Sequence, residues 1–341
     1  MKKGIIGAGN WIIDKVKTID RWPSEGELCN VLSQEKAGGG GPCNVLFDLA
    51  ALNSGIPLYA AGMVGSDEDG AWLCNEIESR EIDSRYMKKA GNGIPTAATD
   101  VMSGNGRRTF FYCGLANNSL SVEDLAVIDV PAKIFYLGYL LLLDKLDAED
   151  PEYGTAAARL LDIMQKKGYR TAVDMVSEAG EKFNQIIPPA MKYTDILVIN
   201  EIEAGNTIGE AIRLQDNSLR YELFSKAADK FFELGVKDVV VIHFPEGAYA
   251  ATRDGERIYQ ASCTVEKSEI VGTNGAGDAF FAGFLFAIHE GIPMKDALKI
   301  ASASARFNLK AATASGGAPR KDELLNYVSS CSFGEIPEFF R

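Results

Sequence analysis

A glycine-rich segment followed by an acid is the stretch of this sequence best suited to chemistry. Residues 272–277 read Gly-Thr-Asn-Gly-Ala-Gly, and Asp278 opens a run to His289 in which apolar residues recur at helical spacing. The first N–H groups of a helix lack partners within the helix, and the helix dipole favours negative charge there. The segment therefore predicts an anion site made of backbone amides, with a carboxylate beside it.

The carboxylate of Asp278 has two interpretations. A carboxylate beside a bound phosphate could accept the proton of a hydroxyl group that attacks the phosphorus. Alternatively, Asp278 is an ordinary acid in the first turn of a helix, where acids are favoured in any case. Just before the glycines, Ile270 and Val271 predict the end of a buried strand. The predicted unit is therefore a strand, a glycine loop and a buried helix.

The segment Asn200-Glu201-Ile202-Glu203 also has two interpretations. Asn is a good N-cap, and a glutamate three residues later completes a capping box. The two glutamates could instead order a hydrated Mg²⁺ that carries nucleotide phosphates, since Mg²⁺ prefers oxygen ligands and keeps several waters. The two roles are compatible.

Two further segments combine glycines with a polar side chain. Four consecutive glycines, residues 38–41, precede Asn44 and a helix-like run. They indicate either a close approach of the backbone to a ligand or a flexible linker. Near the N-terminus, the Gly-Ala-Gly of residues 7–9 precedes Asp14, which is either an acid of a turn or strand edge or a residue that binds the hydroxyl groups of a substrate. Ile12 stands where a dinucleotide-binding fingerprint has its third glycine, so an NAD-dependent dehydrogenase is not supported.

The elements that must position these side chains alternate in type along the second half of the chain. This alternation is typical of a mostly parallel sheet with helices on both faces, and ligands bind such sheets beyond the carboxyl ends of the strands. Asp174, Asn200 and the loop at Gly272 all fall at such ends. The predicted strands are 133–137, 170–174, 194–199 and 238–243, and the predicted helices are 155–166 and 219–234.

Two regions with hairpin patterns precede this alternation. Residues 14–37 and 94–117 alternate like strands, and Asn105-Gly106 is a strong hairpin signal. We expect the two regions to form one small sheet that acts as a lid. Residues 1–341 are then a single α/β domain, with a mostly parallel sheet flanked by helices and a small β-sheet lid.

Composition limits the classes of function. The 341 residues carry a formal net charge of −12, which disfavours nucleic acid and anionic membranes as partners. The longest apolar runs, residues 134–143 and 279–288, are about half of a membrane span, and the N-terminus lacks a signal-peptide pattern. The six cysteines include no C-x-x-C pair, and there are two histidines. We therefore expect reduced thiols, no zinc site and a cytoplasmic protein.

The motifs, taken together and in order, resemble those of the ribokinase-like (PfkB-type) carbohydrate kinases. The resemblance runs from Gly4 to about Pro319. Its most specific part is the C-terminal signature, which spans Thr273 to Phe280 and contains Gly-Ala-Gly-Asp. The remaining matches are Gly9 with Asp14, Gly39 and Gly40 with Asn44, Gly62 to Gly70, Arg108 to Phe110, and Asn200 with Glu203.

The resemblance implies a large α/β domain with a small β lid, which transfers the γ-phosphoryl group of ATP to a primary hydroxyl group of a sugar or nucleoside. It implies Asp278 as the base and the amides of Gly275, Ala276 and Gly277 as the anion hole. The acceptor would be held by Asp14, Gly39, Gly40, Asn44 and Arg108. The nucleotide would be held by Asn200, Glu203, Thr273, Gly275, Gly277 and Ser302, with Glu203 reaching Mg²⁺ through water.

Four positions depart from the family pattern. Gly272 replaces an acid that the family associates with a monovalent-cation site, so dependence on such a cation stays open. Ile12 replaces a polar residue two positions before the acceptor-binding acid. Pro245 lies in the segment that usually reads Thr-x-Gly near the nucleotide, and it removes one N–H donor. Ser302 stands where an Asn near adenine is common.

The acceptor and the assembly stay open at this point. Ribose, fructose, a 2-keto-3-deoxy acid and a nucleoside all fit the resemblance. A phosphorylated acceptor would need cations near the lid, which Arg107, Arg108, Lys36 and Arg21 could supply, although these residues could equally be ordinary exposed charges of the lid. A non-catalytic sugar- or nucleotide-binding sensor is the alternative to a kinase, because Pro245 alters the nucleotide segment. Exposed edges of the lid invite pairing with a second subunit, which predicts a homodimer through the lids.

Overall fold

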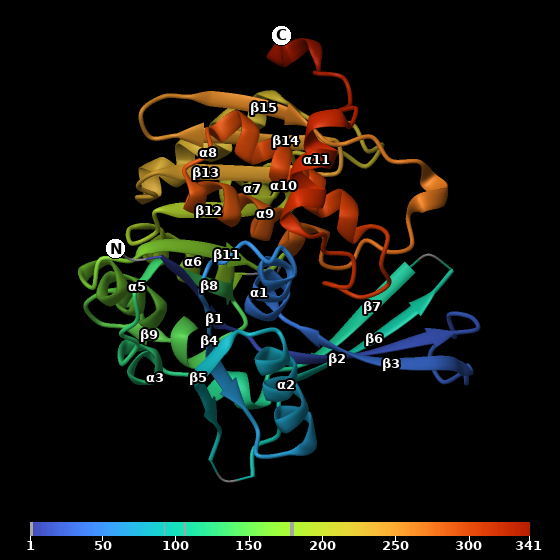
Figure 1. Cartoon of the computed structure of the whole chain (residues 1–341), viewed down its shortest axis with the longest axis vertical. Helices are drawn as coiled ribbons and strands as arrows, with labels where there is room; N and C mark the ends of the chain where they lie inside the picture. Colours follow the sequence, from blue (N-terminus) through green and yellow to red (C-terminus); the bar gives the residue numbers. More distant parts are fainter. Residues whose placement is uncertain (1–2, 92, 106, 178–180) are drawn as a thin grey trace.

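The computed structural model describes residues 3–91, 93–105, 107–177 and 181–341. Its largest element is a nine-stranded sheet (Figure 1). The strands β13, β12, β11, β8, β1, β4 and β5 pair in parallel, whereas β14 and β15 pair antiparallel at one edge. The mostly parallel sheet predicted from strand–helix alternation is confirmed. The spatial order is β15 (Arg257–Ala261), β14 (Gly247–Thr252), β13 (Val239–Phe244), β12 (Ile196–Asn200), β11 (Arg170–Met175), β8 (Ala132–Leu140), β1 (Gly4–Gly9), β4 (Leu58–Val64) and β5 (Asp83–Lys89).

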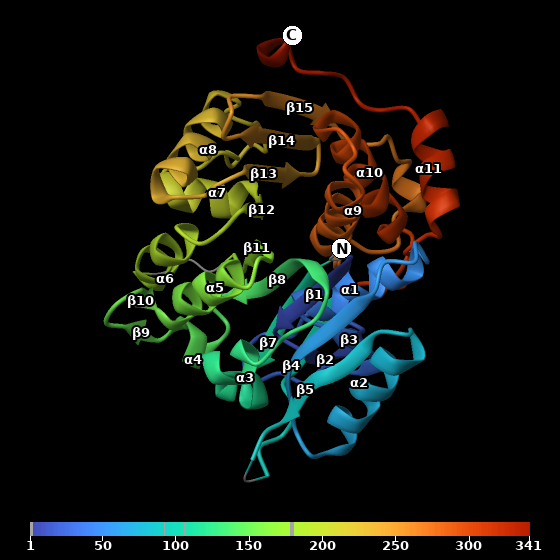
Figure 2. The ribbon, with the colours of Figure 1, turned by 60° about the vertical axis from the view of Figure 1, so that its left-hand side comes forward.

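Helices cover both faces of this sheet, and each face has its own buried apolar cluster (Figure 2). Ile5 and Ile6 belong to opposite clusters, because successive side chains of a strand point to opposite faces. One face is covered by α1 (Gly41–Ala51), α2 (Glu68–Ser79), α9 (Ala276–Glu290), α10 (Met294–Asn308) and α11 (Lys321–Ser330). The other is covered by α3 (Val122–Ala126), α4 (Asp144–Asp147), α5 (Ala156–Lys166), α6 (Glu181–Met191), α7 (Glu201–Ile208) and α8 (Glu222–Leu234).

The remaining elements are short. They are β9 (Glu149–Asp150), β10 (Gly154–Thr155) and the 3₁₀ turns η1 (Leu115–Ser119), η2 (Lys267–Glu269) and η3 (Glu338–Phe340). Within the described ranges, no helix combines the length and the apolar character needed to cross a membrane.

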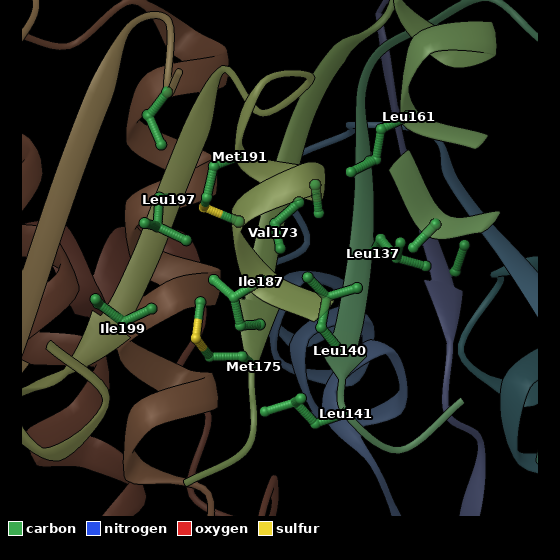
Figure 3. Packing of buried hydrophobic residues seen from close by; sticks show 14 of the residues in the cluster. Leu137, Leu140, Leu141, Leu161, Val173, Met175, Ile187, Met191, Leu197 and Ile199 are labelled. Atoms are coloured by element: carbon green, nitrogen blue, oxygen red, sulfur yellow. The ribbon is translucent and has the colours of Figure 1, made fainter. Parts of the chain in front are cut away.

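Figure 3 shows how the second of these faces is packed. The strands β8, β11 and β12 present aliphatic and methionine side chains to α5 and α6, and all of them are buried. Burial of one such side chain stabilises the fold by roughly 1.5–3 kcal/mol. This layer therefore fixes strands whose carboxyl ends carry the predicted polar residues. The labelled side chains are Leu137, Leu140, Leu141, Leu161, Val173, Met175, Ile187, Met191, Leu197 and Ile199.

A separate four-stranded sheet lies beside the large one (Figure 1). Its spatial order is β3 (Val31–Gly39), β2 (Ile12–Ile19), β6 (Ala98–Gly104) and β7 (Arg107–Cys113). The hairpin patterns predicted the antiparallel pairs β2–β3 and β6–β7, and both are present. Asn105 in the β6–β7 turn has a φ of 51°, which suits a hairpin turn, while Gly106 lies outside the described residues. Because β2 and β6 pair in parallel, the two hairpins form one sheet.

The prediction that Ile270 and Val271 end a buried strand is wrong. Neither residue belongs to a strand, and their exposed fractions are 38% and 62%. The turn η2 precedes them, and the N–H of Val271 donates to Leu309 O at 2.8 Å, at the C-terminal end of α10. The main chain at Val271 bonds to the end of a helix and does not pair with a strand, although both residues are apolar.

Candidate active site

A cleft of about 1030 Å³ lies between the small sheet and the carboxyl ends of the parallel strands. Asp174, Asn200 and the loop at Gly272, which we expected at one edge of the sheet, all line it. Segments far apart in the sequence therefore meet at one place. The other predicted residues that line the cleft are Asp14, Gly40, Asn44, Arg108, Glu203, Thr273, Gly275, Ala276, Gly277 and Asp278.

The glycine loop before α9 is held in a conformation that requires glycine. Gly275 has a φ of 74°, and a Cβ atom there would lie 2.2 Å from Ala314 O, so only glycine fits. The helix α9 begins at Ala276, and none of the described side chains caps its N-terminus. From α10, the side chain of Asn308 donates to Asn274 O at 2.8 Å and fixes the loop from the other side. The first amides of α9 can therefore bind an anion.

Asp278, in the first turn of α9, is only 7% exposed. Tyr139 Oη donates to its Oδ1 at 2.7 Å, and Asn44 Nδ2 donates to its Oδ2 at 2.8 Å. Burial raises the pKa of Asp278 to about 6, while both hydrogen bonds lower it because they favour the charged form. The carboxylate is therefore mostly ionised at neutral pH and can accept a proton.

Asp14 faces the cleft from β2, opposite Thr99 on β6. Burial raises its pKa to about 7, the charge of Asp278 adds to this, and a hydrogen bond with Thr99 opposes it. Gly39 does not line the cleft, but a Cβ atom there would lie 2.5 Å from the Asp14 carboxylate. Gly40 has a φ of 86°, and its Cβ would lie 2.2 Å from a main-chain oxygen of the β1–β2 connection. The glycine run therefore lets its main chain pack closely against β2 and the β1–β2 connection, and it is not a flexible linker.

Asn200 and Glu203 form the predicted capping box at the start of α7. Asn200 Oδ1 accepts the N–H of Glu203 at 2.9 Å, and Glu203 Oε2 accepts the N–H of Asn200 at 2.9 Å. Ser177 Oγ also donates to Glu203 at 2.7 Å. Burial raises the pKa of Glu203 to about 7, and burial together with the charge of Glu203 raises the pKa of Asp174. A buried acid beside a half-buried one whose pKa it raises favours a cation at this edge.

Arg108 brings a positive charge from β7 to the glycine loop. Its Nη2 lies 3.5 Å from Ala312 O, and a Cβ atom at Gly272 would lie 2.9 Å from the same nitrogen. The absence of a side chain at position 272 thus leaves room for the guanidinium. Among the described residues that line the cleft, Arg108 is the one lysine or arginine, against the four acids Asp14, Asp174, Glu203 and Asp278.

Ser302 is not brought to the cleft. It is 7% exposed within α10, and its hydroxyl accepts the N–H of Cys263 at 2.9 Å. The chain at Cys263 therefore covers the position that the motif match associated with the nucleotide. A sequence match could place Ser302 on a helix but could not show which segment packs over it.

Sequence patterns missed several residues that the fold brings to the cleft, among them Tyr139, Thr99 and His243. Tyr139 lies in an apolar run that indicated only a strand, and its place near a strand end was the available signal. The ring of His243 lies tilted at 5.2 Å from that of Phe280, beside Gly277, and burial lowers the pKa of His243 to about 4, so it is neutral.

Sequence comparison relates this chain to carbohydrate kinases. The model of the pfkB family carbohydrate kinases matches residues 8–321. The chain is 25% identical to the ribokinase of Arabidopsis thaliana over 327 residues, which cover 95% of this chain and 80% of that protein. It is 26% identical to a 5-dehydro-2-deoxygluconokinase of Clostridium perfringens over 297 residues, which cover 85% and 83%.

The fold is also shared with a solved structure. Arabidopsis thaliana ribokinase, complexed with ribose and ATP, aligns with a TM-score of 0.78 at 22% identity, covering 96% of this chain and 99% of that one. The expected ribokinase-like fold is therefore confirmed. Because the family model spans nearly the whole length, the chain belongs to the pfkB family of carbohydrate kinases.

Proposed function

We propose that this kinase transfers the γ-phosphoryl group of ATP to a primary hydroxyl group of a sugar or sugar-like acceptor. The observation that carries the proposal is a buried, ionised carboxylate at Asp278 in the same cleft as the uncapped amides before it. Phosphoryl transfer needs an oriented hydroxyl group and stabilised charge on the phosphoryl oxygens. This arrangement can supply both.

In the proposed reaction, Asp278 accepts the proton of the acceptor hydroxyl as its oxygen attacks the γ-phosphorus. The bond between the γ-phosphorus and the bridging oxygen breaks, and ADP leaves. The amides of Gly275, Ala276 and Gly277 donate to the negatively charged oxygens, as the donors of an anion hole do. Thr273 and Asn200, which line the same cleft, are proposed to contact the nucleotide.

The acidic edge of the cleft fits Mg²⁺. Burial raises the pKa of Glu203, and burial together with the charge of Glu203 raises the pKa of Asp174, so a cation between these acids and the phosphates would be stabilised. We propose that Glu203 holds the ion through water, in line with the preference of Mg²⁺ for oxygen ligands and retained waters. When bound, the ion would neutralise charge on the phosphates.

The acceptor would lie between Asp14 and Asp278. Asp14, Asn44 and the main chain at Gly40 suit the hydroxyl groups of a sugar, and Arg108 suits the carboxylate of a sugar acid. The relatives named a ribokinase and a 5-dehydro-2-deoxygluconokinase support an acceptor of this kind. A nucleoside is the second acceptor class, because the rings of Phe110 and Tyr112 also line the cleft from β7.

The small sheet is proposed as both lid and dimer interface. Its residues, 14–37 and 94–117 with their flanks, lie over one side of the cleft, and β3 and β7 are its edges. Leu32 and Phe111 are 65% and 58% exposed on these edge strands. Unpaired edges with exposed apolar side chains pair readily with a second copy, which supports a homodimer.

An ATP-consumption screen across sugars, sugar acids, sugar phosphates and nucleosides tests the proposed reaction. We expect ATP turnover with a sugar or sugar acid, and mass spectrometry should find the phosphate on a primary hydroxyl group. Turnover with nucleosides alone would favour the second acceptor class. Tight binding of a sugar without product, in the presence of ATP and Mg²⁺, would overturn the proposal in favour of a sensor.

A further inference from the structure

The carboxylate proposed as the base is held from two sides. Tyr139, near the carboxyl end of β8, donates to Oδ1 of Asp278 at 2.7 Å, and Asn44 on α1 donates to Oδ2 at 2.8 Å. Donors on different oxygens fix both the position and the rotation of a carboxylate. Because an ionised carboxylate has about four acceptor sites, a hydroxyl group can still bind it.

Tyr139 is itself fixed by groups that do not touch Asp278. Its main-chain N–H donates to Oδ1 of Asn10, which is fully buried, and Asn10 Nδ2 donates to Leu142 O at 3.0 Å. Its ring lies against the start of α1, where a Cβ atom at Gly41 would be 2.9 Å from the ring. A side chain at position 41 would displace the ring, so the glycine run also serves to place Tyr139.

The small sheet reaches the same network through Tyr112 on β7. Tyr112 Oη donates to Leu142 O at 3.4 Å and accepts from Asn10 Nδ2 at 3.5 Å. One side chain of the small sheet therefore contacts two of the groups that hold the main chain around Tyr139.

We propose that Tyr139 is a positioning residue that holds the Asp278 carboxylate at the orientation the acceptor hydroxyl needs, and that Tyr112 makes this placement depend on the small sheet. The inference rests on the proposed kinase function, in which Asp278 is the base. Neither tyrosine belongs to a motif that the sequence pattern singled out.

The surroundings of Asp278 explain why a donor matters there. Its charge raises the pKa of the acids around it, and its own pKa is raised by burial and lowered by the hydrogen bonds from Tyr139 and Asn44. Loss of the Tyr139 hydroxyl should therefore leave more of the base protonated near neutral pH. The titratable groups that face this region are Asp14 on β2, Cys43 and Asp48 on α1, Tyr136 and Tyr139 on β8, Asp174 on β11 and His243 on β13.

The first test is Tyr139→Phe in the full-length protein, assayed with ATP and the acceptor found in the screen. We expect kcat to fall by about 10- to 100-fold, as for the loss of a hydrogen bond to a charged group. The acidic limb of the pH profile of kcat should also move to higher pH, with little change in KM for ATP. An unmoved limb with a raised KM for the acceptor would overturn the proposal, because Tyr139 would then act by binding the acceptor.

Tyr136→Phe is the matched control. Tyr136 lies on the same strand and is fully buried, and its hydroxyl has no hydrogen-bond partner among the described residues. Removal of that hydroxyl should leave kcat and its pH profile as in the wild type. An equal loss of activity in both variants would overturn the assignment, since the effect would then follow from loss of any buried tyrosine hydroxyl.

A measurement without turnover separates this inference from the proposed function. A wild-type protein that phosphorylates no acceptor contradicts the kinase proposal, whatever Tyr139 does. The pKa of Asp278 can still be followed by ¹³C NMR of its carboxyl carbon. We expect the pKa of Asp278 to be higher in Tyr139→Phe than in the wild type and to be unchanged in Tyr136→Phe. Equal pKa values in the wild type and both variants would overturn the positioning role.

The link to the small sheet is tested by a double-mutant cycle. Tyr112→Phe should lower kcat by about 2- to 5-fold, because its hydrogen bonds are long. If both tyrosines act through the same carboxylate, the double variant should be no slower than Tyr139→Phe alone. Multiplicative losses would overturn the link between Tyr112 and Asp278.

Discussion

The large and the small sheet differ in how completely their strands are buried. The large sheet has helices on both faces, and β1 and β4 are buried along their whole length (Figure 2). The small sheet is covered less: α2 contacts it through Asp69 and Trp72, but most of β3 and all of the larger side chains of β7 are exposed or half-buried. We infer that the rigid layer holds the base and the anion loop, whereas the loosely packed layer supplies groups that can move over the acceptor.

The acids of the cleft come from both parts. Asp278 and Glu203 lie on the large part of the molecule, and each accepts hydrogen bonds from two residues. Asp14 lies on the small sheet, where it is also buried, hydrogen-bonds with Thr99 and has the charge of Asp278 nearby. The contrast between the two sheets leads to four predictions. They test whether the large part provides catalysis and most of the stability, and whether the small sheet covers the acceptor and forms the dimer.

The largest effect is expected for Asp278→Asn. An amide cannot accept the proton of the acceptor hydroxyl, so kcat should fall by about 10²- to 10⁴-fold while nucleotide affinity stays within a few-fold of the wild type. Initial rates and calorimetric binding measure both quantities. A variant with a near wild-type rate would show that Asp278 is not the base.

Core truncations should separate the two sheets by stability. Leu137→Ala removes a fully buried side chain from the layer shown in Figure 3 and should lower the free energy of unfolding by about 2–5 kcal/mol. Phe111→Ala, at a side chain that is 58% exposed on the small sheet, should lower it by less than about 0.5 kcal/mol. Urea denaturation of the two variants measures the contrast, and equal losses would contradict it.

The free energy of unfolding should decrease as pH rises, because several acids of the cleft have raised pKa values. The pKa values of Asp14, Glu203 and Asp278 are about 7, 7 and 6, above their ordinary values, so the folded protein keeps protons that the unfolded chain has lost. Their contribution to the free energy of unfolding is therefore present at low pH and lost as pH rises through these folded-state values.

Asp14→Asn removes one of these groups. The loss of stability between pH 5 and pH 8 should then be smaller than in the wild type, by on the order of 2 kcal/mol. Denaturation curves at the two pH values measure this, with Glu25→Gln on the exposed β2–β3 loop as the control. The same difference in the wild type and in Asp14→Asn would contradict the buried, raised state of Asp14.

Phe111→Lys should have the smallest effect on the free energy of unfolding, but it should change the oligomeric state. A charge on the exposed face of β7 should weaken pairing of two small sheets without unfolding the protein. Light scattering at micromolar concentration should find a dimer for the wild type and a smaller mass for the variant. A monomeric wild type would refute the proposed dimer.

Much of the fold and part of the site could be predicted from the sequence. Local patterns predicted the alternating strands and helices, the hairpins and the capping box at Asn200, because each depends on residues a few positions apart. The same local reasoning failed at Ile270 and Val271, because the main chain of Val271 bonds to the C-terminal end of α10 and the apolar pair joins no strand. Ser302, which the family resemblance associated with the nucleotide, does not line the cleft and accepts the N–H of Cys263.

The sequence by itself determined that a glycine loop precedes an acid at the start of a helix, and that strand ends carry Asp174 and Asn200. Only the tertiary structure decided what surrounds that acid. Tyr139 and Asn44 meet Asp278 across separations of 139 and 234 residues, and no local period reports such contacts. The physical reason is that local spacing records which face of an element is buried, whereas the partner on that face is chosen by packing of the whole chain.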